Sequence, residues 1–295
     1  MKRLVNTGHM VSSVCEYVGI SRQAYHKRLN KTVADSCLYD TMEKVVLKNR
    51  RVKSRAGLRT IHTKEGLSTL LGVNRFEKQM SLRGYALKPY KSYVKTTDSR
   101  GHHHKYDNLI SGHNITGSNQ VIVGDITYYT TTSGRYYIFL FTDLYTLEIK
   151  GAVASRNMLG IHAEKCLRQV IKYNKTNQYN TKMIVHTDGG GQYRSDSYQQ
   201  MLRNMGILPS QSISCYENGL AERVNGIIKN EYLNDYTIKS EKHLNAVLKR
   251  IQNQHNQVWP STRLGGKTPK EFSQWVNTLS KKDKPIVHVK TIANE

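Results

Sequence analysis

Apolar residues recur at helical spacing over about the first 95 residues of the chain. In residues 12–29 the apolar positions allow two short helices to share a small core. Gly19 is placed to break the chain between these helices, and Ser21 is a favourable N-cap for the second one. This spacing predicts a helix-turn-helix, for which a plain helical hairpin with a basic face is the alternative.

The second of these helices would display polar and basic side chains that suit contact with DNA. These side chains are Arg22, Gln23, His26 and Lys27. A further helical stretch runs from about Leu38 to Leu87 and is dense in Arg and Lys. Residues 91–119 then lose this periodicity and stay polar and basic, which is typical of a linker between domains. The consecutive histidines 102–104 cannot readily converge on one metal ion, so we interpret them as solvated.

From residue 120 the apolar pattern changes to that of strands. Three β-rich runs fill residues 120–155, and the segment TTTSG predicts a hairpin between the first two. Residues 157–175 return to a helical period, and the run KMIVHTD, residues 182–188, reads as a fourth strand. Because crossovers through a helix are right-handed in nearly all sheets, we expect the fourth strand to lie parallel to the first and beside it.

Two aspartates occupy these strands at positions where an isolated carboxylate would be costly. Asp125 lies among apolar neighbours in the first strand, and Asp188 ends the fourth. If the two strands are adjacent, the carboxylates repel each other unless a divalent cation neutralises them. Carboxylate oxygens favour Mg²⁺, with Mn²⁺ as a substitute. The glycines after Asp188 would let a phosphate backbone approach closely, but a glycine-rich turn that merely follows an aspartate is the alternative.

A third acid is carried by a helix predicted beyond residue 218. Glu222, Asn225 and Lys229 share one face of this helix. A carboxylate on that face can point toward a metal while an ammonium points toward a phosphate. A solvated glutamate on an amphipathic helix is the alternative interpretation.

Other polar motifs are assigned structural roles. We interpret His186, two residues before the second aspartate, as a packed side chain, and Asp143 in FTDLYT as a turn residue. The segment GGKT, residues 265–268, lacks the earlier glycine of a nucleotide-binding loop. Thr268 and Glu271 are instead spaced as a helix capping box with a proline in the first turn, so ATP is not implied.

Composition then narrows the class of partner. The chain has 45 Lys and Arg against 22 Asp and Glu, a formal net charge of +23, which favours a polyanion such as nucleic acid. The longest apolar run, YYIFLF, is far shorter than the ~20 residues that span a membrane. No apolar segment of a secretory signal follows the basic N-terminus. The four cysteines lack the spacing of a zinc module or a disulfide framework, which indicates a reduced, cytoplasmic protein.

Taken in chain order, four motifs resemble the OrfB-type transposases of the insertion-sequence-three family, whose catalytic half is similar to retroviral integrase. GDITYYTTTSGRYYIFLFTDLYT resembles the family's first-aspartate strand and hairpin, and HTDGGGQY resembles the second-aspartate signature. ENGLAERVNGIIKNE resembles the segment that carries the glutamate, and HNQVWPSTRLGGKTPKEF resembles the terminal block.

The resemblance has local departures. Between Asp188 and Glu222 lie 33 residues, two fewer than is usual in the family, so the loop SISCYENG is shorter. Gly219 stands where the family prefers alanine, and Gly124 replaces the usual threonine before the first aspartate.

The resemblance implies an α/β fold of the RNase H-like type, in which helices flank a mixed five-stranded sheet. An all-α N-terminal region would precede this fold. The expected divisions are a helix-turn-helix-type DNA-binding region, a basic linker, an integrase-like catalytic core and a basic C-terminal tail, over residues 1–95, 96–119, 120–275 and 276–295.

The resemblance also implies a transposase that cleaves the ends of an insertion sequence and transfers the strands to DNA. Two Mg²⁺ ions would be held by Asp125, Asp188 and Glu222. The expected partners are the terminal inverted repeats, target DNA, further copies of the chain and an upstream OrfA-type protein, in the cytoplasm and on the nucleoid. A domesticated or inactive DNA-binding protein and an RNase H-like nuclease that only hydrolyses are the alternatives.

Four further residues are expected near the cut. Arg223 and Lys229 would contact phosphates, and Gln192 and Tyr193 would shape the loop beside Asp188.

Overall fold

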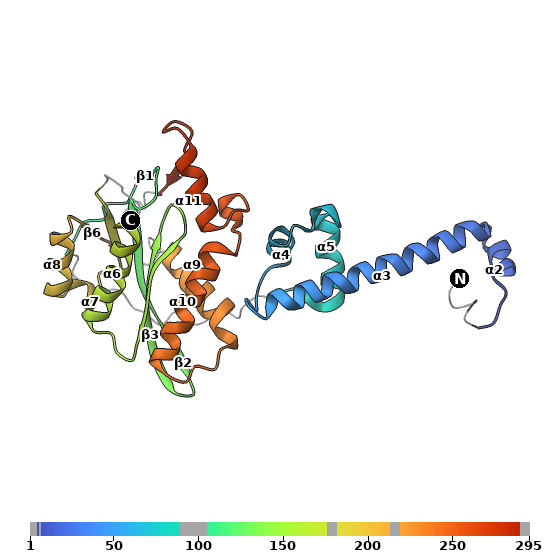
Figure 1. The fold of residues 1–295 in the computed structure, drawn as a ribbon, viewed down its shortest axis with the longest axis horizontal. Coiled ribbons are helices and arrows are strands. Elements are labelled where there is room, and N and C mark those ends of the chain that lie inside the picture. Colours follow the sequence, from blue (N-terminus) through green and yellow to red (C-terminus); the bar gives the residue numbers. More distant parts are fainter. Residues whose placement is uncertain (1–4, 6, 89–104, 176–181, 213–218, 290–295) are drawn as a thin grey trace, which may run out of the picture.

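Helices form the first part of the chain and a sheet flanked by helices forms the rest (Figure 1). The computed structural model describes residue 5 and residues 7–88, 105–175, 182–212 and 219–289. The predicted histidine cluster at residues 102–104 lies outside the described residues.

The predicted break and cap at the first two helices are both confirmed. Helix α2 (Val11–Val18) ends at Gly19, which has a left-handed φ of 71°. The side chain of Ser21 then accepts a hydrogen bond from the backbone N–H of Ala24 and caps α3 (Arg22–Arg50). The expectation of a short second helix is wrong, because α3 has 29 residues. Neither glycine nor proline occurs within it, so nothing in the sequence interrupts the helix.

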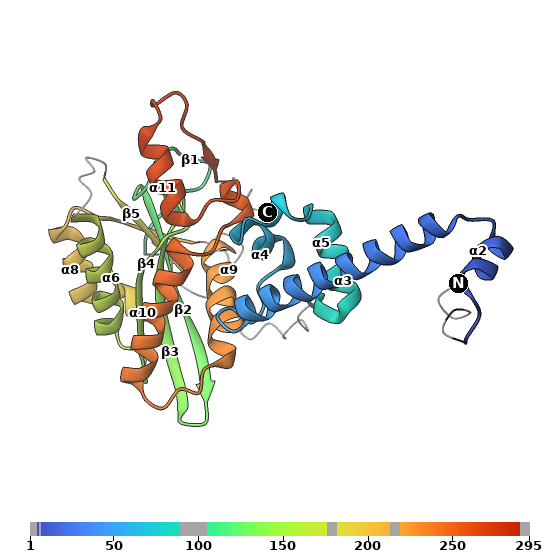
Figure 2. The same ribbon diagram turned by 45° about the vertical axis from the view of Figure 1, so that its right-hand side comes forward.

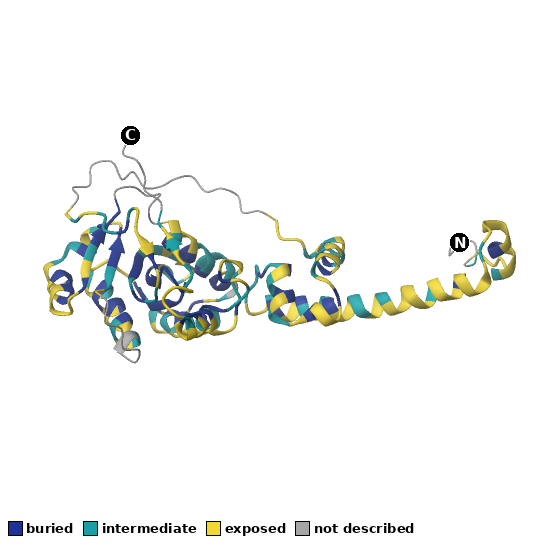
Figure 3. Ribbon diagram, turned by 90° about the horizontal axis from the view of Figure 1, so that it is seen from above, coloured by how far each residue is buried: buried dark blue, intermediate teal, exposed yellow. Residues whose placement is uncertain are grey.

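The first half of α3 projects away from the rest of the molecule and carries α2 at its far end (Figures 1 and 2). Its side chains are mostly exposed (Figure 3). The second half of α3 packs against the remaining N-terminal helices, which are α4 (Leu58–Lys64), η1 (Leu67–Thr69), α5 (Val73–Met80) and η2 (Ser81–Tyr85). Met42, Ile61 and Phe76 are buried between these helices.

The central sheet is mixed and five-stranded, as predicted, in the order β4-β3-β2-β5-β6. Its strands are β2 (Val121–Thr131), β3 (Gly134–Asp143), β4 (Ile149–Ser155), β5 (Ile184–Thr187) and β6 (Leu208–Gln211). The hairpin between β2 and β3 is confirmed, and β4 pairs antiparallel to β3. The parallel placement of the fourth predicted strand beside the first is also confirmed, since β5 pairs parallel to β2.

Helices cover both faces of this sheet (Figure 1). One face packs against α6 (Gly160–Lys175), α7 (Gly191–Arg194) and α8 (Asp196–Asn204). The other face packs against α9 (Gly219–Ile227), η4 (Ile228–Tyr232) and α10 (Glu241–Gln257). The alternation of β3 supplies both cores, because Phe139 and Phe141 face α6 while Ile138 and Leu140 face α10.

Segments before and after the sheet also pack on it. The described part of the predicted linker, residues 105–119, contacts the core through a hydrogen bond from the Leu109 N–H to Ser210. Its strand β1 (Asn114–Ile115) pairs antiparallel with β7 (Val287–His288) from the predicted tail. The remaining elements are η5 (Leu233–Asp235), η6 (Thr262–Leu264) and α11 (Pro269–Thr278).

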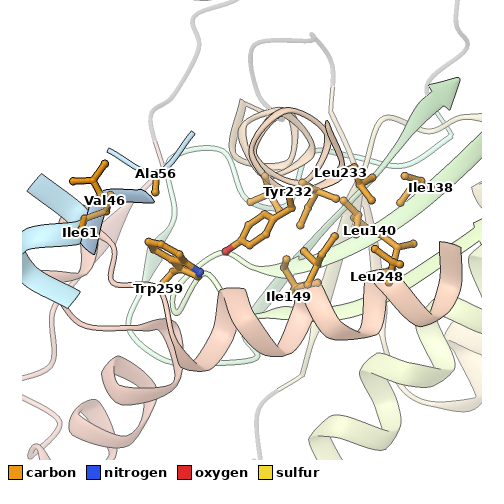
Figure 4. Close-up of a cluster of buried hydrophobic side chains, with 14 of the residues drawn as sticks. Val46, Ala56, Ile61, Ile138, Leu140, Ile149, Tyr232, Leu233, Leu248 and Trp259 are labelled. Carbon is orange, nitrogen blue, oxygen red and sulfur yellow. The ribbon is translucent and has the colours of Figure 1, made fainter. Parts of the chain in front are cut away.

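The N-terminal helices and the sheet share one buried apolar cluster (Figure 4). Val46 comes from α3 and Ala56 from the turn that follows it, and Trp259, which follows α10, lies between them and the residues over the sheet. The ammonium of Lys53 lies 5.2 Å from the Trp259 ring and 2.9 Å from a carboxylate oxygen of Glu231. The turn after α3 is therefore held against α10 and η4 by apolar packing and by charge.

Candidate functional site

The register of two parallel strands brings the predicted aspartates to one edge of the sheet. Val123 on β2 pairs with His186 on β5. Asp125 and Asp188 each follow this last registered pair by two residues, and the charge of Asp188 reaches Asp125. Asp188 is exposed just beyond β5 and accepts a hydrogen bond of 3.0 Å from the N–H of Gly190. The closeness expected from the sequence therefore follows from strand pairing.

The carboxylate of Asp125 is oriented by two hydrogen bonds. One oxygen accepts from the Ile126 N–H at 2.8 Å, and the other accepts from the side-chain amide of Asn225 at 2.6 Å. Asn225 is buried on α9, three residues after Glu222. The spacing of Asn225 and Glu222 in the sequence predicts that they share one face of the helix. It does not predict the contact between Asn225 and Asp125.

A groove of about 670 Å³ lies along this edge, between β2 and α9. Asp125, Glu222, Asn225 and Lys229 all line it. The ammonium of Lys229 lies 3.4 Å from the carbonyl oxygen of Tyr128 and 4.7 Å from that ring. Burial lowers the pKa of Lys229, which no carboxylate among the described residues pairs with. The groove thus combines the carboxylates of Asp125 and Glu222 with a cation on η4, the element that directly follows α9.

The three predicted acids interact electrostatically. Burial and then the charges of Asp188 and Glu222 raise the pKa of Asp125 to about 7, while the hydrogen bonds from Ile126 and Asn225 oppose this rise. No described salt bridge joins any of the three carboxylates to a basic side chain. Within the described residues, no three His, Cys, Asp or Glu side chains lie close enough to hold one metal ion. The three acids are therefore close enough for their charges to interact, but the described side chains do not converge on one metal ion.

The glycines beside the aspartates make room for neighbouring side chains. A Cβ at Gly124 would lie 2.2 Å from the ring of Phe141, so that ring occupies the space that a threonine would need. Gly189 has a φ of +72°, and a Cβ there would lie 2.2 Å from the side chain of Gln211. Both positions accept glycine because of local packing and backbone shape.

The residues given structural roles are buried. His186 is fully buried with Nδ1 2.9 Å from the hydroxyl of Ser210, and burial lowers its pKa to about 4. This confirms a packed, neutral histidine. Asp143 accepts hydrogen bonds from the N–H groups of Tyr145 and Thr146, which confirms its turn role. The capping box of Thr268 and Glu271 is confirmed at the start of α11.

The two loop-shaping candidates lie on α7, directly after the glycines. Tyr193 is buried between Phe141 and Tyr198, with ring centroids 6.3 and 5.7 Å away. Burial and then the charge of Asp188 raise the pKa of Tyr193. Gln192 precedes it and is half-buried. Tyr193 therefore anchors the segment after Asp188 to the core of the sheet.

The predicted DNA-contact residues fall into separate places. The four N-terminal candidates are exposed on the first turns of α3, remote from the groove, and they are Arg22, Gln23, His26 and Lys27 (Figure 3). Lys229 lines the groove with the acids. Arg223 lines a different cavity on another side of α9. None of the described helices is long and apolar enough to cross a membrane.

Family models match the middle and later part of this chain, and a known protein is similar to it over most of its length. Two family models, each described as an integrase core domain, match residues 116–214 and 204–269. An uncharacterized 31 kDa protein of insertion element IS600 from Shigella sonnei is 26% identical over 271 residues, which cover 88% of this chain and 97% of that protein.

Two further proteins complete the comparison. The transposase InsF for insertion sequence IS3A of Escherichia coli (strain K12) is 31% identical over 160 residues, which cover 53% of this chain and 54% of that protein. The HTLV-2 integrase catalytic core domain in complex with magnesium is 20% identical, with a TM-score of 0.41 over 56% of this chain and 99% of that one. With an integrase core in its middle and insertion-element proteins as relatives, the chain belongs to the insertion-sequence-three family of OrfB-type transposases, whose core is integrase-like.

Proposed function

We propose that this chain cleaves the ends of an insertion sequence and joins them to target DNA, in a Mg²⁺-dependent reaction that requires Asp125, Asp188 and Glu222. The observation that carries the proposal is the meeting of β2, β5 and α9 at one edge of the sheet, with an acid from each. The net charge of +23 supports DNA as the substrate.

The three carboxylates fit a divalent metal by their chemistry. They are oxygen ligands whose charges are not balanced by a basic side chain among the described residues. We propose that all three would hold Mg²⁺, for which Mn²⁺ can substitute, and that their mutual repulsion would be relieved there. Such ions supply activation of the attacking oxygen and stabilisation of the leaving 3′ oxygen in an in-line phosphoryl transfer.

The residues of the chain itself would position the acids and the DNA. Asn225 donates to one oxygen of Asp125 and the Ile126 N–H donates to the other, so the two bonds would hold this carboxylate in one orientation at the wall of the groove. Lys229 offers an ammonium to a phosphate that enters the same groove. Neutral His186 and buried Tyr193 support the backbone on either side of Asp188. No residue of the chain has to form a covalent bond to DNA in this mechanism.

The other regions would deliver DNA to the groove. We propose that residues 1–95 bind the terminal inverted repeats through the exposed start of α3, and that residues 96–119 join them to the core over residues 120–275. The tail over residues 276–295 is proposed to add positive charge. Cutting two element ends requires two sites, so we propose that copies of the chain assemble on DNA, with an OrfA-type protein as a further partner.

An oligonucleotide assay tests the proposal. Duplexes with the element's own ends are mixed with protein and Mg²⁺, and both nicked and joined products are measured. Wild-type protein should give both products, and Asp188→Asn should lose at least about a thousandfold in rate because a metal ligand is removed, with DNA affinity nearly unchanged. Cleavage by Asp188→Asn at the wild-type rate would show that the acids are not the metal site. Nicked products without joined ones would indicate a nuclease that only hydrolyses.

A further inference from the structure

Helix α9 lines both a groove and a separate cavity. Its residues Glu222 and Asn225 border the groove between β2 and α9, which Lys229 of η4 also lines. Arg223 is rotated from Glu222 by about 100° around the helix axis and borders a second cavity of about 310 Å³. This second cavity lies between α9, the turn that follows α3 and the connection between α10 and α11. We call it the arginine cavity.

The arginine cavity has an excess of positive charge. Lys53, Arg55, Arg223 and Arg263 all line it, against the single carboxylate of Glu231. That carboxylate is already paired with Lys53 at 2.9 Å. The positive charges of Arg223 and Arg263 attract an anion to a concave site rather than to a flat surface.

Two of these arginines lie close together, and no described residue supplies either of them with a counter-charge. No described hydrogen bond or salt bridge joins Arg223 or Arg263 to a carboxylate. Burial and then the charge of Arg223 lower the pKa of Arg263, so the two guanidinium groups repel each other. An anion between them would remove this repulsion, and guanidinium groups bind phosphate oxygens in pairs.

The indole N–H of Trp259 is an independent indication that the arginine cavity binds a ligand with hydrogen-bond acceptors. Its side chain lines the same cavity and is 3% exposed. The indole Nε1–H is buried and has no hydrogen-bond acceptor among the described residues. A buried N–H is usually paired, so an unpaired one at the wall of a cationic cavity suits a bound oxygen-rich ligand. Apolar side chains of Leu87, Leu220 and Ile227 complete the wall.

We propose that the arginine cavity binds one nucleotide of a DNA strand, with its phosphate on Arg223 and Arg263 and its sugar or base against the apolar wall. The mixture of cationic and apolar lining suits a nucleotide better than a free phosphate ion. This inference rests on the proposed function, because the bound strand belongs to the DNA that the acids act on. DNA would then contact α9 on two sides, and the distance between the groove and the arginine cavity would help to set which phosphodiester is cut.

Binding without cleavage tests this site. The affinity of the full chain for an element-end duplex is measured in EDTA over a series of salt concentrations. The double variant Arg223→Gln/Arg263→Gln should bind roughly tenfold more weakly. The slope of log affinity against log salt should fall by about one, as expected for a lost phosphate contact. Arg223→Lys/Arg263→Lys should recover part of the affinity but not all, because lysine cannot bind phosphate bidentately.

A matched variant controls for net charge. Arg168→Gln/Arg203→Gln also removes two exposed arginines, from α6 and α8 on the other face of the sheet. This variant should change affinity and salt slope much less than the variant of the arginine cavity. Equal effects of the two double variants, or no effect of either, would overturn the proposal.

A second measurement does not depend on the variants. Arginine modification by phenylglyoxal, read by mass spectrometry, should be suppressed by DNA at Arg223 and Arg263 but not at Arg168. Inorganic phosphate should protect them only at much higher concentration, and equal protection by phosphate would reject a nucleotide site. The proposed function is tested separately by Asp188→Asn, so intact metal-dependent cleavage with unprotected arginines would refute the arginine cavity alone.

Discussion

Asn225 donates a hydrogen bond of 2.6 Å to Asp125, and this bond joins α9 to β2 across 100 residues of sequence. It connects the helix that carries Glu222 to the strand that carries the first aspartate. A shift of α9 would therefore change the orientation of two of the three acids at once.

Removing this amide should alter the pH dependence of cleavage. The bond from Asn225 lowers the pKa of Asp125, so Asn225→Ala should raise that pKa and move the acidic limb of the rate profile to higher pH. At neutral pH we expect a rate roughly tenfold lower, the loss typical of a buried hydrogen bond to a charged group. The measurement is cleavage rate from pH 6 to about 9 at fixed Mg²⁺. A uniform loss at every pH, without a shift, would count against a specific effect on Asp125.

The metal-free protein should lose stability as pH rises through about 7. The pKa of Asp125 is raised from 3.8 to about 7 in the folded chain, so the folded state binds this proton more tightly than the unfolded state. The contribution is complete below about pH 4 and lost above about pH 7, and it amounts to roughly a few kcal/mol. Urea unfolding in EDTA at several pH values measures it. Asp125→Asn should remove this trend.

The comparison with Asp125→Asn is needed because buried histidines change the stability of the folded chain with pH in the opposite direction. Burial lowers the pKa of His186 and of His255 to about 4. These histidines contribute stability that is present above their unfolded pKa and lost as pH falls toward 4. If wild type and Asp125→Asn had the same pH dependence, Asp125 would not be the perturbed acid.

Mg²⁺ should stabilise the folded chain at pH 8. A ligand that binds the folded state alone raises the free energy of unfolding by about 2.7 kcal/mol at a concentration of a hundred times its Kd. Thermal unfolding with Mg²⁺, and with KCl at the same ionic strength as a control, measures the shift. Asp188→Asn should reduce it strongly. An equal shift in KCl would mean that ionic strength, and not metal binding, is responsible.

A methyl group at position 124 should destabilise the core. The ideal Cβ of Gly124→Ala would lie 2.2 Å from the Phe141 ring, and such overpacking costs about 1–3 kcal/mol. Denaturant unfolding of the variant measures the loss. Gly219→Ala is the matched control, because nothing lies within 4 Å of its Cβ position. Phe141→Leu should relieve part of the loss, and additive effects of Gly124→Ala and Phe141→Leu would contradict the proposed clash.

The attachment of the N-terminal helices should depend on Lys53. Its ammonium contacts the rings of Tyr232 and Trp259 and pairs with Glu231. Lys53→Met should therefore lower the free energy of unfolding by about 1–2 kcal/mol and increase cleavage by protease after α3.

An exposed ion pair within the N-terminal helices provides the control. Arg59 pairs with Glu77 at 2.7 Å, and their side chains are 58% and 38% exposed. Arg59→Met should change stability by less than about 1 kcal/mol. A similar small effect of Lys53→Met would indicate that apolar packing alone holds the two parts together.

Much of the fold follows from local sequence. The alternation of apolar residues predicted β2, β3 and β4, and the helical period of residues 157–175 predicted the crossover that makes β5 parallel to β2. Gly19 and Ser21 marked the boundary between α2 and α3 because they act within one turn of the backbone. The length of α3 does not follow from the apolar spacing, which indicates a short helix and then a separate helical stretch. No glycine or proline lies between the two, so they form one continuous helix.

The candidate site, like the fold, depends partly on local sequence and partly on tertiary contacts. The sequence by itself determined which acids are placed among apolar residues and which residues share a face of α9, because these depend on strand and helix periods. The tertiary structure alone decided that Asn225 reaches Asp125, that Phe141 excludes a side chain at position 124, and that Arg223 meets Arg263 in a separate cavity. These contacts join residues far apart in the chain, and their geometry is set by how the helices pack on the sheet rather than by any local period.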